Sequence, residues 1–351
     1  MPHHIRYRSD RRRILLMVAI ANLVLALGVA LVLYTSWERN RAGIQQILQS
    51  EAAFWSDAMN QRFDQVQSTC DMAGQQLQRD PGLLLQPEPW LDDMVKLMPF
   101  IDGAALVAPN GALLAADPKP GRKLPPRADF TSRPSFQLAL KSPGKVQIGL
   151  SQPDPFDPTQ TTTPARCALR VPPTDKTVVL VFNLGLQRAL SDLQHTLSAF
   201  DGRDRWVPAI GLLRGDGYLL ARLPAPLPHT RNDLARAPAR GVLAREIAAN
   251  PSRTHGFFQG PVQSAGGVET MGAWQRLGDH SVVAFTSLPV SALTGLWWRQ
   301  SWPTLLTWGL LLVLQLVGGV FISRAVERQH RLAEINAALA QANQVVAEAP
   351  D

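Results

Sequence analysis

The sequence predicts an α+β protein with two tandem lobes on one long N-terminal helix, flanked by two transmembrane helices. Two windows, 14–37 and 300–323, contain no charged residue, and each is longer than the roughly 20 residues that cross a bilayer. Apolar residues at helical spacing follow the first window, and two groups of short apolar runs fill the middle of the chain. Groups of strands beside helices are typical of α+β folds.

The charges beside these windows predict how the chain is oriented. Five arginines and one aspartate precede the first window, and Arg324, Arg328 and Arg331 follow the second. By the positive-inside rule both termini are cytoplasmic and the part between the spans is outside, where Tyr34, Trp37 and the tryptophans beside the second window fit an aromatic belt. A cleavable signal peptide is the alternative for the first window, but the apolar run is longer than usual and lacks an A-x-A ending.

One amphipathic helix is predicted after the first span, because apolar residues recur at alternating four- and three-residue steps. They are Leu48, Ala52, Trp55, Met59, Phe63, Val66, Cys70, Ala73 and Leu77. We expect this helix to end at Asp80, because Pro81 and Gly82 do not continue it.

The membrane-distal lobe follows, and its short apolar runs predict strands. They are expected at 104–108, 113–116, 145–150, 166–171 and 177–182. The sequence Pro-Asn-Gly at 109–111 predicts a hairpin turn, a short helix is expected from Ser132 to about Lys141, and the proline-rich stretch 152–164 is expected to be a loop.

The membrane-proximal lobe repeats this arrangement. Strands are expected at 207–214, 218–222, 256–259, 270–275 and 281–287, and a helix with irregular flanks within 223–254. Gly-Asp-Gly at 215–217 suits a tight hairpin, so Asp216 is interpreted as a turn residue and Arg222 as a solvated residue at a strand end.

Cys70 and Cys167 are the two cysteines of the chain, and both are expected outside the cytoplasm. A disulfide between them would tie the long helix to the first lobe. Two buried free thiols that act as small apolar residues are the alternative.

The segment after the second span carries an apolar seam at heptad spacing. Its members are Leu332, Ile335, Leu339, Ala342 and Val346. The seam predicts a parallel homodimer through a short coiled coil, with an amphipathic helix on the bilayer surface or a frayed tail as the alternative.

Three stretches and their order in the chain resemble the double Cache (PAS-like) sensor domains of bacterial membrane receptors. VAPNGALLA from Val107, followed by DFTSRPSF from Asp129, is similar to their "dpnG-vla … D-sdRpyf" pattern. IGLLRGDGYLLARLP from Ile210 is similar to the "llr-DG-llaR-P" stretch of sensors that precede diguanylate cyclase, phosphodiesterase or histidine kinase modules. The resemblance covers about residues 14–345 and implies two tandem Cache lobes.

The resemblance also implies a ligand site in the distal lobe, with Arg133, Phe136, Asn183 and Asp129 as candidate ligand-binding residues. A guanidinium holds a carboxylate through two parallel hydrogen bonds, and an aromatic wall excludes water. Asn183 stands where amino-acid-binding members carry aspartate, and Ser135 where they carry a bulky aromatic residue, so a neutral or purely anionic ligand is equally open. The alternative role of Arg133 is an ion pair with Asp129 at the start of the helix.

The expected boundaries follow from these features. They are a basic cytoplasmic tail (1–13), a first transmembrane helix (14–36), a long periplasmic helix (37–80), a distal Cache lobe (81–200), a proximal Cache lobe (201–298), a second transmembrane helix (299–323) and a cytoplasmic coiled-coil-like helix (324–351).

Catalytic patterns are missing from the sequence. Gly144 and Lys145 lack a preceding phosphate loop, and the seven histidines show no metal-ligand spacing. The net charge of +7 is concentrated at the N-terminal anchor and otherwise diffuse, which does not favour nucleic-acid binding. We therefore expect no enzyme, no cofactor and no metal.

The function that these expectations support is a sensor in a bacterial inner membrane. It would bind a small periplasmic solute, such as an amino acid, a carboxylate or an amine, and pass a conformational change to a cytoplasmic output. That output would belong to a separate partner or to a longer receptor, with diguanylate cyclase first and histidine kinase second by family analogy. The alternative is a membrane-anchored scaffold or envelope-assembly protein that binds other proteins and no small ligand.

Overall fold

The computed structural model describes residues 3–118, 130–153, 161–171, 176–201, 208–225, 241–262 and 266–347. It divides into two compact units, one made of Gly43–Ala292 and the other of Met1–Ala42 with Leu293–Asp351. The candidate residue Asp129 lies outside the described residues, as do parts of the predicted loop 152–164 and of the predicted helical region 223–254.

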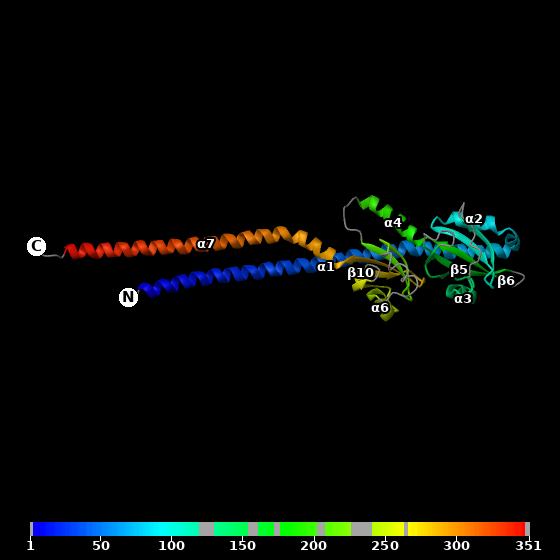
Figure 1. Cartoon of the computed structure of the whole chain (residues 1–351), viewed down its shortest axis with the longest axis horizontal. Helices are drawn as coiled ribbons and strands as arrows, with labels where there is room; N and C mark the ends of the chain where they lie inside the picture. Colours follow the sequence, from blue (N-terminus) through cyan, green and yellow to red (C-terminus); the bar gives the residue numbers. More distant parts are fainter. Residues whose placement is uncertain are drawn as a thin grey trace. The chain divides into compact units, whose positions relative to one another are not determined.

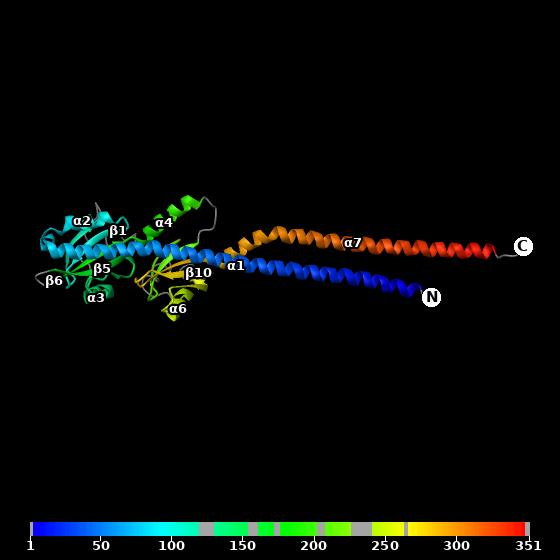
Figure 2. The same cartoon turned by 180° about the vertical axis from the view of Figure 1, so that it is seen from behind.

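Helix α1 (His3–Arg79) runs along both sheets of the unit Gly43–Ala292 (Figure 2). It carries the predicted apolar stripe, which packs into the core that both sheets share. All nine residues of the stripe are at most 4% exposed. The helix ends at Arg79 because Pro81 and Gly82 follow. The Asp80 side chain accepts a hydrogen bond from Gly82 N at 2.9 Å and caps the short 3-10 helix η1 (Pro81–Leu85).

The distal lobe is an antiparallel sheet covered by helices on both faces (Figure 1). Its strands are β1 (Ile101–Val107), β2 (Leu113–Pro118), β3 (Gln147–Ile148), β4 (Gln152–Pro153), β5 (Thr161–Val171) and β6 (Lys176–Leu184), in the order β2-β1-β6-β5-β3 with β4 paired to β5. Helices α1 and α2 (Pro87–Leu97) pack on one face and α3 (Pro134–Lys141) on the other.

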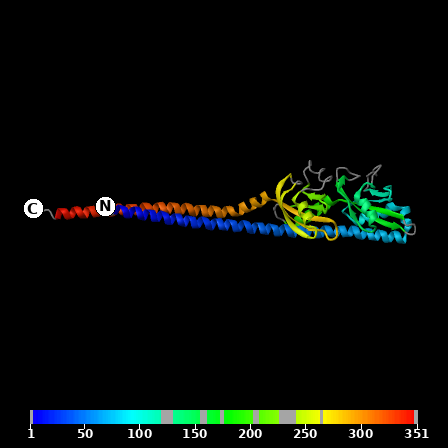
Figure 3. The ribbon, with the colours of Figure 1, turned by 90° about the horizontal axis from the view of Figure 1, so that it is seen from below.

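The proximal lobe is a second antiparallel sheet beside the same helix α1 (Figure 3). Its strands are β7 (Ala209–Arg214), β8 (Leu219–Leu223), β9 (His255–Val262), β10 (Val268–Arg276) and β11 (Val282–Pro289), in the order β8-β7-β11-β10-β9. Helix α4 (Leu186–Asp201) follows β6 directly and packs with α1, and α6 (Val242–Ala249) covers the opposite face of the proximal sheet.

The predicted strands of both lobes are present, although the run at 145–150 shortens to Gln147–Ile148. The predicted loop 152–164 is wrong at both of its described ends, because β4 and the start of β5 pair with each other there. Two helices, α2 and α4, were not predicted. Both carried a readable signal, because Pro87 and Pro89 suit the first turn of a helix and α4 repeats Leu186, Ala189, Leu190 and Leu193 at helical spacing. Within the predicted helical region 223–254, the described helix is α6.

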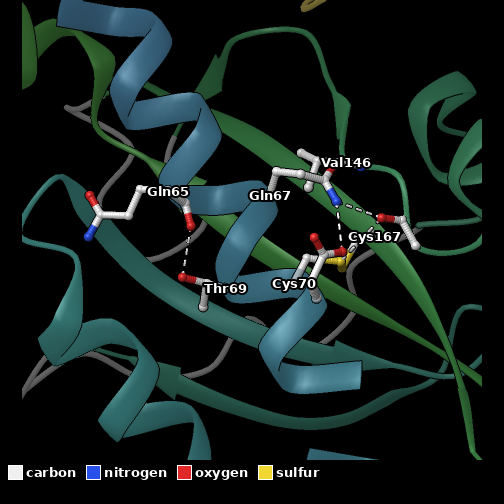
Figure 4. The surroundings of a disulfide bond; sticks show 8 residues. Gln65, Gln67, Thr69, Cys70, Val146 and Cys167 are labelled. Carbon is white, nitrogen blue, oxygen red and sulfur yellow. Dashed lines mark hydrogen bonds between the residues drawn. A yellow bond between two sulfur atoms is a disulfide. The ribbon is translucent and has the colours of Figure 1, made fainter. Parts of the chain in front are cut away.

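The structure joins Cys70 of α1 to Cys167 of β5 in a disulfide, with the Cα atoms 6.5 Å apart (Figure 4). Gln67, one turn before Cys70, holds the turn that precedes β3: its Nε2 donates to Gly144 O at 2.7 Å, and its Oε1 accepts from Val146 N at 2.9 Å. The disulfide and the two hydrogen bonds of Gln67 therefore fix this part of the long helix to the β5 side of the distal lobe.

Buried and partly buried polar contacts join the two lobes to each other. Ser151 Oγ donates to Leu220 O in β8 at 2.7 Å and also lies 2.7 Å from Thr163 Oγ1 in β5. Gln187 Nε2 in α4 donates to Arg222 O at 2.7 Å, and Arg222 N donates to Gln187 Oε1 at 3.2 Å. Strand β8 of the proximal lobe is thus hydrogen-bonded to segments that leave the distal sheet.

The second unit contains the two apolar helix segments. Helix α7 (Val290–Ala347) lies beside the first part of α1: Trp37 and Trp297 meet edge to face at 5.7 Å, and Asn40 Nδ2 donates to Gln300 Oε1 at 3.1 Å. By length and composition both helices are able to cross a membrane.

The tryptophans and the apolar seam of α7 are also placed in this unit. The ring of Trp298 is tilted against those of Trp297 and Trp302, at centroid distances of 6.3 and 6.0 Å, so the tryptophans of the predicted aromatic belt form one cluster. Of the seam, Leu332, Ile335 and Leu339 are exposed, and the side chains at 342 and 346 are outside the described part. Dimer formation stays a prediction.

Candidate functional site

The candidate site lies on the face of the distal sheet that α3 covers, which we call the α3 face. Strand alternation places Arg166 of β5 and Asn183 of β6 on this face, because Ala168 and Val181 on the same strands belong to its apolar cluster. The buried members of that cluster are Ala105, Val107, Ala116, Phe136, Ala168, Val179 and Val181. The α3 face is therefore apolar around two polar side chains.

Arg166 brings a guanidinium into these surroundings. The residue is 2% exposed, its Nη1 donates to Ser135 Oγ in α3, and its Nε is buried without a hydrogen-bond partner. A Cβ at Gly149 would lie 2.6 Å from Nη1, so the segment between β3 and β4 packs directly against the guanidinium. Burial, and secondarily the positive charge of Arg133, lower the pKa of Arg166 to about 10, which leaves the side chain charged at neutral pH.

This arginine has no counter-charge among the described residues. A nearby carboxylate would favour the charged form of Arg166, whereas the neighbouring charge is that of another arginine, Arg133. A buried ion without a partner is costly, and buried polar atoms are hydrogen-bonded in the great majority of proteins. An anion bound beside Arg166 would therefore balance a buried positive charge that the described residues leave unpaired.

The structure describes three of the four residues that the resemblance suggested, two on helix α3 or at its N-cap and one on the strand β6. Arg133 is exposed at the N-cap of α3, Phe136 is fully buried with its ring 6.3 Å from that of Phe130, and Asn183 is 8% exposed in β6 between Gly103 and Pro164. Asp129 lies outside the described residues, and its suggested ion pair with Arg133 stays a prediction.

The sequence analysis missed Arg166 and interpreted Ser135 as a departure from the motif. The signal for Arg166 was present in the strand sequence ARCALRV, where an arginine alternates onto the same face as Ala168. A charged residue in the middle of a buried strand is rare without a partner, and such a position points to a binding role.

The proximal lobe contains a second buried arginine, so the interpretation of Arg222 as solvated is wrong. The residue is 6% exposed, because α4 covers β8 and Gln187 pairs with its backbone. Its Nη1 donates to Pro224 O at 2.7 Å, its Nε is unpartnered, and burial lowers its pKa. Asp216 pairs with Arg214 at 2.5 Å and is a turn residue, as predicted.

Two antiparallel sheets on one long helix, with a short helix over the outer face of each sheet, give the chain the fold of Cache-type sensor domains. No protein-family model matches the sequence, and no curated protein matches it. Solved structures do match, and they show the fold.

Three of these structures illustrate the match. The extracellular domain of the proposed histidine kinase rpHK1S-Z16 is 17% identical, with a TM-score of 0.54 over 71% of this chain and 95% of its own. The extracellular domain of the proposed histidine kinase soHK1S-Z6 is 13% identical, with a TM-score of 0.51 over 75% and 98%. The ligand-binding domain of the Pseudomonas aeruginosa amino-acid chemoreceptor PctB is 15% identical, with a TM-score of 0.48 over 71% and 92%.

Proposed function

We propose that this chain is a two-pass membrane receptor that binds a small periplasmic solute on the α3 face of its distal lobe. The observation that carries the proposal is the buried guanidinium of Arg166, whose Nε has no partner and whose neighbouring charge is another arginine. Ligand sites combine an apolar surround with a few convergent polar groups, and Phe136, Ser135 and Asn183 provide that combination here.

The membrane topology of the proposal follows the charge pattern. Five arginines precede the first apolar window and three follow the second, so both termini are cytoplasmic and both lobes are periplasmic. The cluster of Trp37, Trp297, Trp298 and Trp302 then lies at the outer interface, where tryptophan is enriched. The exposed seam of α7 pairs two copies of the chain in the cytoplasm and carries the signal to an output partner.

The contacts between the lobes supply a route from the ligand to the proximal lobe. Thr163 lies three residues before Arg166 on β5 and contacts Ser151, which bonds to Leu220 O in the proximal sheet. The segment that carries Ser151 also contains Gly149, which packs against the guanidinium. A ligand that moves Arg166 therefore shifts the balance between two arrangements of this junction, provided that it binds one of them more tightly.

Ser151→Ala is expected to lower the free energy of unfolding by about 1–3 kcal/mol, because buried Thr163 Oγ1 and Leu220 O lose a partner. Chemical denaturation of the full chain in detergent measures this. Ser50→Ala is the matched control, since that hydroxyl is exposed and bonds only to Ile47 O of its own helix turn. Equal stability of the two variants would contradict a role of Ser151 in joining the lobes.

A thermal-shift screen of the purified full chain in detergent tests the receptor function itself. Amino acids, organic acids and amines are compared, and we expect at least one class to raise the melting temperature through preferential binding to the folded state. The same compounds should bind more weakly to Arg133→Ala, because one of the two guanidiniums at the site is removed. If no compound of any class shifts the melting temperature, the small-ligand receptor is ruled out.

The scaffold alternative would then gain support from one feature of the distal lobe. Leu85 of η1 and Leu97 of α2 are 85% and 60% exposed. Exposed leucines of this kind suit a contact with another protein when they belong to one patch.

A further inference from the structure

We propose that the α3 face binds the carboxylate of a small organic acid that carries no ammonium group, and that Arg166 anchors this carboxylate. The inference rests on the proposed receptor function and specifies its ligand class.

One hydrogen-bond donor of the site has no acceptor. Nη1 of Arg166 is used by Ser135 Oγ, whereas Nε is buried and unused. An oxygen that accepts from Nε would complete the guanidinium, which forms its strongest pairs with planar oxyanions. Because Ser135 Oγ accepts from Arg166, its own hydroxyl proton is available to a second oxygen.

The position of Ser135 adds a further preference for an anion. It is the second residue of α3, and Arg133 is the N-cap of this helix. Pro134 has no N–H, and the N–H groups of Phe136 and Gln137 are bonded to Arg133 O, so the helix dipole is what gives this turn a partial positive charge. Arg166, Arg133 and the start of α3 therefore contribute positive potential to the same place on the sheet.

The same face offers an ammonium group nothing of opposite charge among the described residues. Asn183 is neutral, and it is the polar side chain that β6 places there. The carboxylate of Asp102 in β1 is bound to Arg188 at 2.6 Å. Asp117 in β2 pairs in register with Ala104, which belongs to the core on the opposite face. An ammonium near two guanidiniums would be repelled, so an amino acid would bind less tightly than the acid of the same skeleton.

Isothermal titration of the full chain in detergent tests this with sets of compounds that share a carbon skeleton. One set is leucine, 4-methylpentanoate and 3-methylbutylamine, and another is phenylalanine, 3-phenylpropanoate and 2-phenylethylamine. Aspartate and succinate form a third set, and inorganic phosphate and sulfate are added as other oxyanions. We expect one acid to bind at least about tenfold more tightly than its amino acid, with no binding by the amine.

Two variants of Arg166 and one control then identify the anchor. Arg166→Met is expected to lower the affinity for the acid by at least about thirtyfold, because the charged partner of the carboxylate is lost from a buried pair. Arg166→Lys keeps the charge but not the planar fork, so an intermediate loss is expected, and it serves as the second variant if Arg166→Met does not fold. Arg170→Met replaces an exposed arginine on the same strand and should leave the affinity unchanged.

Four results would contradict the proposal, and each would overturn a different part of it. Tighter binding of an amino acid or an amine than of the acid would overturn the ligand class and leave the receptor function standing. If the acid binds Arg166→Met and Arg166→Lys as tightly as it binds the wild type, Arg166 does not anchor the ligand. If phosphate or sulfate binds more tightly than every acid, the site does not select a carboxylate. No binding by any compound would overturn the inference together with the receptor function.

Discussion

Replacing both cysteines, Cys70→Ser with Cys167→Ser, is expected to lower the free energy of unfolding by about 2–5 kcal/mol. The two residues are 97 positions apart, so the bond closes a long loop and restricts the unfolded chain strongly. For a unit of this size the loss corresponds to a decrease of roughly 5–15 °C in melting temperature. Differential scanning calorimetry of the full chain in detergent measures this decrease.

A reductant provides the matched control for the disulfide. The wild-type protein should melt at the lower temperature of the double variant once it is reduced, and the double variant should not respond to the reductant. If the oxidised wild type and the double variant melt at the same temperature, the bond does not stabilise the distal lobe.

Arg166→Met is expected to stabilise the ligand-free protein by about 1–3 kcal/mol while it removes ligand binding. The guanidinium of Arg166 is buried without a counter-charge among the described residues, and burial lowers its pKa to about 10. Methionine has a similar length and no charge to desolvate, although Ser135 loses its donor. Chemical denaturation of the wild type and the variant at neutral pH gives the difference.

The pH dependence of this difference follows from the lowered pKa. Below pH 10 the arginine is charged in both the folded and the unfolded chain, so the full cost of burial is present. Above pH 10 and up to the ordinary pKa of arginine, the unfolded chain binds more protons than the folded chain, and the wild type gains stability relative to the variant. Arg170→Met is the control and should change stability by less than about 0.5 kcal/mol. An Arg166→Met protein that is less stable than the wild type at neutral pH would contradict the unpaired charge.

Much of the fold was predictable because the spacing of apolar residues along a segment indicates which of its side chains are buried. The stripe on α1 repeats at helical spacing, and every one of its members is buried. The hairpin around Gly217 was predictable from local chemistry, since a φ of 95° there favours glycine. Helix α4 was not predicted although Leu186 and Leu190 have helical spacing, because it begins two residues after the end of β6 and continues the same apolar run.

The site was predictable only in part, because its key property is the absence of a partner. The family pattern led to Arg133, Phe136 and Asn183, and the structure places all three around the α3 face. Whether an arginine such as Arg166 or Arg222 is solvated or buried depends on which helix covers its strand. That is decided by long-range packing, which a run of residue types along one strand does not contain.

A structure of the full chain bound to the small acid with the highest affinity would show whether Arg166 anchors the ligand. We expect the ligand on the α3 face, with a carboxylate oxygen at about 2.7–3.2 Å from Arg166 Nε and the hydroxyl of Ser135 beside it. A ligand bound elsewhere in the chain, with Arg166 Nε still unpartnered, would contradict it.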